Sequence, residues 1–388
     1  MANIKLMNKI SPIGTDVFKG GDYNVGEDVE APVGLMVRSA ALHDMEFGPE
    51  LLGIARAGIG VNNIPIEDCS KKGIVVFNTP GANANAVKEL AIAALLLASR
   101  NITGGVEWAK TLAGDAEAAK LVEKGKSKFE GPELLGKKLG VIGLGAIGVM
   151  VANTAYNLGM EVYGYDPYIS INAAWSLSRH VNKSDSLKAI CEQCDYITIH
   201  VPLNPATKGY INDELFSHMK DGVRIINLSR GEVVDNAAML KALESGKVAK
   251  YVTDFPSAEV LEMPNTVCIP HLGASTPESE NNCAYMAAAQ LKNYIEYGII
   301  KNSVNLPEVD TMPDCKYRIC MIHENIPNMI SQLTTALGDA GVNIEHLTNK
   351  SKKDMAYSII DTNDNLPADL EAKVSAVAGI LKVRVIAY

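Results

Sequence analysis

The feature that most constrains this chain is the segment from Lys138 to Gly148, which reads KLGVIGLGAIG. A short apolar run leads into glycines spaced Gly-x-Gly-x-x-Gly and then into a helical pattern. In such a turn Gly143 permits the tight bend, Gly145 leaves bare backbone beside a pyrophosphate, and Gly148 lets the helix pack closely on the strand. The segment therefore predicts a parallel α/β domain that binds a dinucleotide.

The residues after the glycines indicate which dinucleotide is bound. The helix begins near Ala146 and Ile147, and its free N–H groups and positive dipole end suit a phosphate. Asp166 follows the next apolar run about 20 residues on, where a carboxylate accepts hydrogen bonds from a ribose 2′-hydroxyl. A 2′-phosphate there would meet a like charge. The sequence therefore predicts NAD rather than NADP as the cofactor.

Composition excludes several other classes of protein. The chain has 388 residues, enough for two or three domains, and a net charge of −9. It has no block of Lys and Arg, so we expect no nucleic-acid or membrane partner. Residues 1–10 lack the apolar run of a signal peptide, and the longest apolar run, residues 90–98, is too short to span a bilayer. These features predict a cytoplasmic protein.

The cysteines do not indicate a metal site. Seven are scattered along the chain, and only Cys191 and Cys194 form a Cys-x-x-Cys pair. A structural zinc site would need a second ligand pair at suitable spacing, and a redox pair would open a helix rather than lie late in one. We therefore expect reduced thiols and no metal.

Strand and helix patterns alternate over most of the chain. Apolar runs at 34–38 and 73–78 predict buried strands, and a long apolar helix is expected at 87–100. Residues 101–136 are more polar and helical. After the glycine-rich unit, further strands are expected at 195–201, 223–228, 250–255 and 266–270, followed by a helix at 280–297. This alternation predicts doubly wound parallel sheets in two lobes, with ligands at the carboxyl ends of the strands in the cleft between them.

The last part of the chain has a different pattern. Residues 301–315 are linker-like and contain Pro307 and Pro313. Beyond them we expect a strand at 317–323, a helix at 327–340, strands at 343–349 and 355–361, a helix at 366–379 and a strand at 382–386. The order β-α-β-β-α-β predicts a ferredoxin-like module.

Three polar stretches follow predicted strands of the dinucleotide domain. They are Asn227–Gly231, Asp254–Glu259 and Pro270–Thr276, and they supply an arginine, carboxylates and a histidine. Because the carboxyl ends of parallel strands share one edge of a sheet, we expect these groups to lie near one ligand.

These motifs, in this order and with the glycine-rich turn, resemble the D-isomer-specific 2-hydroxyacid dehydrogenase family. The similarity extends to the phosphoglycerate dehydrogenases that carry a C-terminal ACT domain, and it covers nearly the whole chain. It implies an α/β fold with a Rossmann NAD domain (100–282), a flavodoxin-like substrate domain (1–99 and 283–305) and a ferredoxin-like ACT domain (316–388). It also implies a homodimer or homotetramer, with the long helices near residue 100 at the dimer contact.

The resemblance implies NAD-dependent oxidation of 3-phospho-D-glycerate to 3-phosphohydroxypyruvate, the first step of L-serine biosynthesis. His271 would be the acid/base, since a histidine titrates near neutral pH, and Arg230 would bind the substrate carboxylate through two parallel hydrogen bonds. Glu259 would orient the His271 ring. In many relatives the segment between the acidic stretch and the histidine is longer, so Glu262 competes with Glu259 for this role.

The same resemblance assigns further contacts. Asp254 would contact the nicotinamide carboxamide. Two arginines in the substrate domain suit a phosphate, and the expected substrate contacts are Arg38, Ser39, Arg56 and Gly58. Besides the glycines and Asp166, the expected cofactor contacts are Ala146, Ile147, Pro202, Thr207, Ser229 and Asp254.

The C-terminal module resembles regulatory domains that bind an amino acid. The resemblance implies L-serine as an effector, with contacts from His323, Asn325 and Asn343. The family usually has glycine where this chain has Asn328, directly after Pro327. A side chain there would crowd the effector pocket, so we expect weak inhibition by serine or none.

Two other functions remain open from the residues. The same mechanism could act on another D-2-hydroxyacid, such as glycerate, lactate or 2-hydroxyglutarate, or the scaffold could be a non-catalytic NAD-sensing module. The set Arg230, Glu259 and His271 argues against a sensor, because a sensor needs no base.

Overall fold

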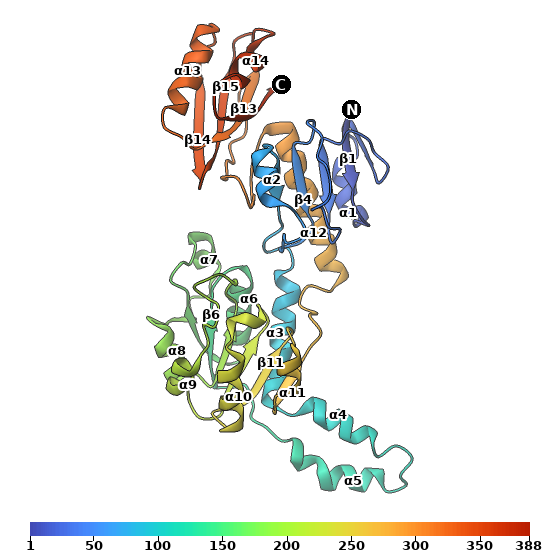
Figure 1. Ribbon diagram of the computed structural model, residues 1–388. Helices are drawn as coiled ribbons and strands as arrows, with labels where there is room; N and C mark the ends of the chain where they lie inside the picture. The colour runs from blue at the N-terminus through green and yellow to red at the C-terminus, as the bar shows by residue number, and fades with distance from the viewer. The chain divides into compact units, whose positions relative to one another are not determined.

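The computed structural model describes residues 1–388, which divide into two compact units. One unit comprises residues 83–279, and the other comprises residues 1–82 and 280–388. Figure 1 labels the elements of both. The three-domain division expected from the sequence remains a prediction.

The unit of residues 83–279 contains a seven-stranded, wholly parallel sheet in the order β12-β11-β10-β9-β6-β7-β8. The strands are β6 (Lys138–Ile142), β7 (Glu161–Tyr165), β8 (Asn182–Lys183), β9 (Tyr196–Ile199), β10 (Val223–Asn227), β11 (Val248–Thr253) and β12 (Thr266–Cys268). Every residue of β9, at the centre of the sheet, is buried, as expected for a parallel strand covered on both faces. The predicted doubly wound lobe is confirmed.

Helices surround this sheet. They are α3 (Ala84–Ser99), α4 (Ile102–Lys110), α5 (Ala118–Gly125), α6 (Ala146–Asn157), α7 (Ile171–Ser176), α8 (Leu187–Gln193), α9 (Asp213–His218), α10 (Asn236–Glu244) and α11 (Ala258–Glu262), with short 3-10 turns at Lys126–Phe129 and Gly231–Val233. Helices α4 and α5 extend away from this sheet in Figure 1. Trp108 and Phe129 pack together there, with ring centroids 5.3 Å apart.

The other unit contains two sheets. The first is parallel, in the order β2-β1-β3-β4-β5, and comprises β1 (Ala2–Leu6), β2 (Tyr23–Gly26), β3 (Gly34–Val37), β4 (Gly53–Arg56) and β5 (Val75–Phe77). This is the flavodoxin-like strand order expected for the substrate lobe. Its helices are α1 (Pro12–Thr15), α2 (Ile66–Lys71) and α12 (Pro277–Tyr297), with a 3-10 turn at Asp16–Phe18.

The second sheet is antiparallel, in the order β14-β15-β13-β16. With its helices it comprises β13 (Tyr317–Glu324), α13 (Met329–Asp339), β14 (His346–Lys352), β15 (Met355–Thr362), α14 (Leu370–Ser375) and β16 (Ile380–Ala387). We call residues 316–388 the C-terminal module. The ferredoxin-like order is confirmed, although β14 begins three residues later than predicted. The Asp364 carboxylate accepts a hydrogen bond from the Asn343 N–H at 2.7 Å, which holds that residue outside the strand.

The C-terminal module shares a hydrophobic core with the parallel five-stranded sheet. One cluster of buried side chains joins Ile4, Phe77 and Leu291 to Tyr357 and Ile359. A Cβ atom on Gly298 would lie 2.5 Å from the Cys320 Sγ, so the backbone after α12 lies directly against β13. The linker-like composition of residues 301–315 therefore does not make the module a loosely attached body.

No single helix is both long and apolar enough to cross a membrane; α3 and α4 together reach that length and composition, but they are bent by 71° where they meet.

Candidate functional site

The glycine-rich turn between β6 and α6 has the geometry predicted for phosphate binding. Gly143 has a φ of +91°, and a Cβ atom there would lie 2.8 Å from the His200 backbone. A Cβ atom on Gly148 would lie 1.9 Å from the Gly143 carbonyl oxygen, so the helix can approach the strand only without a side chain. In contrast, nothing lies within 4 Å of a Cβ atom built on Gly145. The turn is therefore packed at two glycines and open at the third, as bound pyrophosphate requires.

Asp166 follows β7 and is tied to this turn. Its Oδ2 accepts a hydrogen bond from the Leu144 N–H at 2.8 Å, and its Oδ1 accepts one from the Tyr168 N–H at 2.8 Å. The carboxylate therefore both shapes the glycine-rich loop and places a negative charge beside it. Both properties suit the predicted contact with a ribose hydroxyl.

The loops after β9 and β10 carry the next predicted cofactor contacts. The Thr207 hydroxyl donates to the Pro202 carbonyl at 2.6 Å, and the Ser229 hydroxyl donates to the Asn227 amide oxygen at 2.8 Å. Asn227, itself fully buried, also donates to the Arg230 carbonyl at 2.8 Å. These hydrogen bonds give both loops a defined shape at the carboxyl end of the sheet.

His200 lies next to the glycine-rich turn and was not singled out in the sequence. Its ring bonds to the Thr198 hydroxyl at 2.9 Å. Burial lowers the pKa of His200 to about 4, so the ring stays neutral at neutral pH. It is therefore unsuited to exchange a proton in catalysis.

Arg230 and His271 both lie against one aromatic ring. The Phe255 ring packs against the His271 ring with centroids 4.4 Å apart, and the Arg230 guanidinium lies over Phe255 at 5.3 Å. Phe255 was not predicted as a site residue, and only its position directly after Asp254 could have suggested it. The arrangement brings the predicted base and the predicted carboxylate-binding arginine to the same aromatic side chain.

The backbone at His271 is fixed in an unusual conformation. Its φ is +34°, in the left-handed region that most side chains avoid. Its N–H group donates to the carbonyls of Asp254 and Ile269, both at 3.0 Å. These two hydrogen bonds, to the residues that directly follow the parallel strands β11 and β12, therefore fix the strained backbone of His271.

The side chain of Glu259 is not bonded to His271, the partner predicted for it. It is exposed on α11, and its Oε2 accepts a hydrogen bond from the Asn236 amide at 2.9 Å. No hydrogen bond or ion pair joins Glu259 to His271. Asn236, which begins α10, is a partner that the sequence did not reveal.

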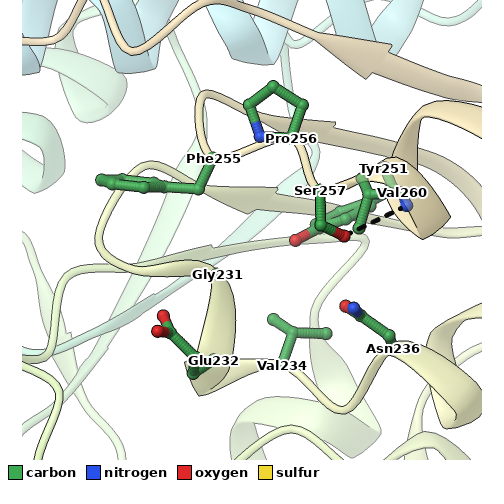
Figure 2. Close-up of a pocket in the computed structure, with 9 residues that line it drawn as sticks. All are labelled: Gly231, Glu232, Val234, Asn236, Tyr251, Phe255, Pro256, Ser257 and Val260. Atoms are coloured by element: carbon green, nitrogen blue, oxygen red, sulfur yellow. Dashed lines mark hydrogen bonds between the residues drawn. The ribbon is translucent and has the colours of Figure 1, made fainter.

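A cavity of about 370 Å³ adjoins this cluster. Figure 2 shows Phe255, Pro256 and Ser257 on one side of it and Glu232, Val234 and Asn236 on the other. Ser257 caps α11 by accepting a hydrogen bond from the Val260 N–H. The cavity borders Gly231 and Phe255, next to Arg230 and His271.

In the other unit, Arg38 directly follows β3, and Arg56 is the last residue of the neighbouring strand β4. Arg38 binds Glu280 with its Nη2 2.6 Å from Oε1, and it borders a cavity of about 280 Å³ that Lys9, Ser11 and Glu280 also line. Burial lowers the pKa of Arg56, and the nearby charge of Arg38 lowers it further. The Arg56 Nε is buried without a hydrogen-bond partner. Two positively charged side chains therefore lie near each other, and only Arg38 forms an ion pair with a carboxylate.

Gly58 explains how Arg56 is accommodated. A Cβ atom on Gly58 would lie 1.5 Å from the Arg56 Nη1, so the guanidinium lies directly against the Gly58 backbone. Ser39 follows Arg38 and is exposed. The four predicted substrate contacts therefore fall at the carboxyl ends of β3 and β4.

The side chains predicted to bind the effector already form hydrogen bonds within the C-terminal module. His323 is 2% exposed, and its ring nitrogens contact the Ser358 hydroxyl at 2.9 Å and the Glu324 carbonyl at 2.8 Å. The Asn325 amide donates to the Lys353 carbonyl, and the Asn343 amide donates to Glu345. Asn328 has a φ of +66°, a conformation that asparagine tolerates nearly as glycine does.

Comparison with known proteins agrees with this geometry. Residues 92–273 match the NAD binding domain of D-isomer specific 2-hydroxyacid dehydrogenases. The chain is 31% identical over 368 residues to D-3-phosphoglycerate dehydrogenase of Haemophilus influenzae, covering 91% of this chain and 86% of that protein. It is 34% identical over 305 residues to D-3-phosphoglycerate dehydrogenase of Methanocaldococcus jannaschii, covering 77% of this chain but 55% of that protein.

Among solved structures, the NAD+-bound 3-phosphoglycerate dehydrogenase of Entamoeba histolytica is similar, with a TM-score of 0.58 and 26% identity. The similarity covers 78% of this chain and 98% of the other. The chain spans about half the length of several curated relatives it matches, including the human protein. The glycine-rich turn, the sheet order and these similarities together show that the chain belongs to the D-isomer-specific 2-hydroxyacid dehydrogenase family and carries its NAD-binding domain.

Proposed function

We propose that this protein is an NAD-dependent dehydrogenase that oxidises 3-phospho-D-glycerate to 3-phosphohydroxypyruvate, the first step of L-serine biosynthesis. The observation that carries the phosphate assignment is the pair of arginines at the carboxyl ends of β3 and β4: Arg38 lines a cavity, and the Arg56 Nε is buried without a partner. Guanidinium groups bind phosphate oxygens through charge-assisted hydrogen bonds. The names of the relatives support the same substrate.

The chemistry follows from the residues of the NAD-binding unit. Bound NAD+ supplies a nicotinamide ring that accepts a hydride. His271 takes the proton of the substrate hydroxyl as the carbonyl forms, and it returns that proton in the reducing direction. Arg230 binds the substrate carboxylate and orients the reacting carbon. We further propose a homodimer or homotetramer.

A panel of 2-oxo acids tests the assignment. We expect the enzyme to oxidise NADH, followed by its absorbance, with a higher kcat/KM for 3-phosphohydroxypyruvate than for hydroxypyruvate, glyoxylate, pyruvate or 2-oxoglutarate. A preference for an unphosphorylated acid would assign the chain to another D-2-hydroxyacid. Binding of NADH without turnover of any acid would favour an NAD-sensing module.

Replacing either substrate arginine should reveal the phosphate contact. Arg38→Ala and Arg56→Ala should each lose about 1.5–3 kcal/mol, roughly 10- to 150-fold in kcat/KM, for phosphohydroxypyruvate, because a charge-assisted hydrogen bond is removed. Hydroxypyruvate turnover should be spared. Arg179→Ala, which removes an exposed arginine outside the predicted sites, is the matched control. Equal losses on both substrates would indicate a structural role instead.

Asp166→Ala should relax the preference for NAD. Removing the like charge should improve NADPH binding relative to NADH by about tenfold or more. The Kd values of the two cofactors, measured by fluorescence, check this ratio. Asp166→Asn retains an acceptor for the Leu144 N–H, so it separates loss of charge from loosening of the glycine-rich loop. An unchanged ratio in both variants would place the discriminating group elsewhere.

L-serine should have little effect on the activity at millimolar concentration. Both ring nitrogens of His323 already have partners, and binding serine there would break a buried hydrogen bond. Initial rates with and without L-serine check the expectation. Strong inhibition would mean that the module rearranges to admit the amino acid.

A further inference from the structure

A carboxylate of the protein binds the arginine to which we assign the substrate phosphate. Glu280 lies in the first turn of α12, and its Oε1 lies 2.6 Å from the Arg38 Nη2. Both side chains line the cavity of about 280 Å³, and both are nearly half exposed. Because the pair is exposed to solvent, it can open without leaving a buried charge. An anionic ligand can therefore use Arg38 only if it displaces Glu280.

The loop after β1 fixes the backbone at both members of this ion pair. The Arg38 N–H donates a hydrogen bond to the Asn8 Oδ1 at 2.9 Å. Three residues later in the same loop, the Ser11 hydroxyl donates to the Asn281 amide oxygen at 2.6 Å. Asn281 directly follows Glu280 in α12. The loop therefore holds the end of β3 and the first turn of α12 in a defined arrangement, with the two charged side chains facing each other.

The same loop supplies a second cation to the cavity. Lys9 lines the cavity between Asn8 and Ser11, is exposed, and forms no ion pair with a carboxylate. The charged side chains that line the cavity are thus two cations, Lys9 and Arg38, and one anion, Glu280. A ligand that displaces the anion has two cations to bind.

Competition with Glu280 distinguishes between ligands by the charge at their far end. A ligand that ends in a carboxylate replaces one arginine–carboxylate pair with an equivalent pair, so it gains little. A phosphate carries close to two negative charges near neutral pH and offers three acceptor oxygens, so it can bind Arg38 and Lys9 together. A ligand with an uncharged end does not engage Arg38 and is not affected by Glu280.

We propose that Glu280 is a specificity-determining residue that excludes 2-oxo acids ending in a carboxylate from the Arg38 cavity. The phosphate of 3-phosphohydroxypyruvate displaces Glu280 and binds both Arg38 and Lys9. The inference rests on the proposed dehydrogenase function. Glu280 takes no part in hydride or proton transfer, so its charge acts on KM and leaves kcat for the phosphorylated substrate unchanged.

Glu280→Gln tests this role in the full-length enzyme, because it keeps the size of the side chain and removes its charge. The KM for phosphohydroxypyruvate should fall about three- to tenfold, since the phosphate no longer competes with a carboxylate. For 2-oxoglutarate, kcat/KM should rise about tenfold or more. The KM for hydroxypyruvate, whose far end is uncharged, should change little. Oxidation of NADH, followed by its absorbance, measures all three.

Glu278→Gln is the matched control for this experiment. Glu278 is an exposed carboxylate in the same turn of α12, and it does not line the cavity. Its substitution should leave the KM of every acid in place. Glu280→Asp retains the negative charge and should continue to exclude 2-oxoglutarate.

Lys9→Met and inorganic phosphate test the cavity from the other side. Lys9→Met removes a cation that the phosphate binds, so the KM for phosphohydroxypyruvate should rise about three- to tenfold. Inorganic phosphate, as a competitive inhibitor against phosphohydroxypyruvate, reports binding without turnover. Its inhibition constant should fall in Glu280→Gln and rise in Lys9→Met.

Two results would overturn the proposal. One is an enzyme that prefers phosphohydroxypyruvate and whose KM values and phosphate inhibition are unchanged in Glu280→Gln, because the ion pair would then be only structural. The other is a lowered kcat with unchanged KM values in Glu280→Gln, which would place Glu280 in the reaction itself. Failure of the proposed function is distinct, since the unsubstituted enzyme would then prefer an unphosphorylated acid or reduce none.

Discussion

His271→Ala should lower kcat by about 100- to 10,000-fold, the usual contribution of a positioned general acid–base. The substitution removes the imidazole, a side chain whose ring nitrogens can both accept and return a proton, whereas the guanidinium of Arg230 only donates hydrogen bonds. Steady-state rates at saturating NADH and phosphohydroxypyruvate measure the loss. NADH binding should change little, because the ring contacts Phe255 rather than the glycine-rich turn.

His346→Ala provides the control for this experiment. His346 is exposed on β14 of the C-terminal module, and its ring contacts only the Thr348 hydroxyl. The control should retain full activity. Near-normal turnover by a folded His271→Ala variant would remove His271 from the mechanism.

Arg318→Met should destabilise the unit of residues 1–82 and 280–388 by about 3–5 kcal/mol. Arg318 is fully buried in β13 and binds Asp361 through two parallel contacts, Nε to Oδ1 at 2.7 Å and Nη2 to Oδ2 at 2.8 Å. Its Nη1 also donates to the carbonyls of Tyr297 and Thr311. Removing the guanidinium leaves a buried charge and two carbonyls without their donor. Urea denaturation measures the loss of unfolding free energy.

Two matched variants isolate the cause. Arg318→Met combined with Asp361→Leu removes both charges and should recover most of the lost stability, because an apolar pair has no desolvation penalty. Lys301→Met breaks the exposed Lys301–Asp310 pair and should cost less than about 1 kcal/mol. Equal losses from Arg318→Met and Lys301→Met would show that the buried pair contributes nothing beyond a surface ion pair.

The position of Arg318 matters because it joins the C-terminal module to the rest of its unit. Further hydrogen bonds cross the same boundary: Arg384 donates to Tyr294 and Ile295, and the Tyr357 hydroxyl donates to Gly298. Lys382 donates to the Pro49 and Leu51 carbonyls, and burial lowers its pKa to about 8. These partly buried hydrogen bonds stabilise the packing of the C-terminal module against the rest of its unit.

The elements whose cause is local could be predicted from the amino-acid sequence. Glycines at fixed spacing, apolar runs bounded by turns and an acid after β7 predict a dinucleotide domain, because each depends on backbone conformation or on side chains close in sequence. The ferredoxin-like order was predictable for the same reason. The first residue of β14 was not, since the bond from Asn343 to Asp364 joins residues far apart in the chain.

The contacts between side chains far apart in the chain could not be predicted and are set by the folded structure. Both Asp254 and Glu259 follow β11, but burial at the sheet edge places one beside His271, and α11 directs the other to Asn236. Likewise, a Pro-containing linker predicts a separate module, whereas its buried face shares a core with the parallel sheet. Apolar burial and pairing between distant strands set these contacts, and neither leaves a periodic signal in the sequence.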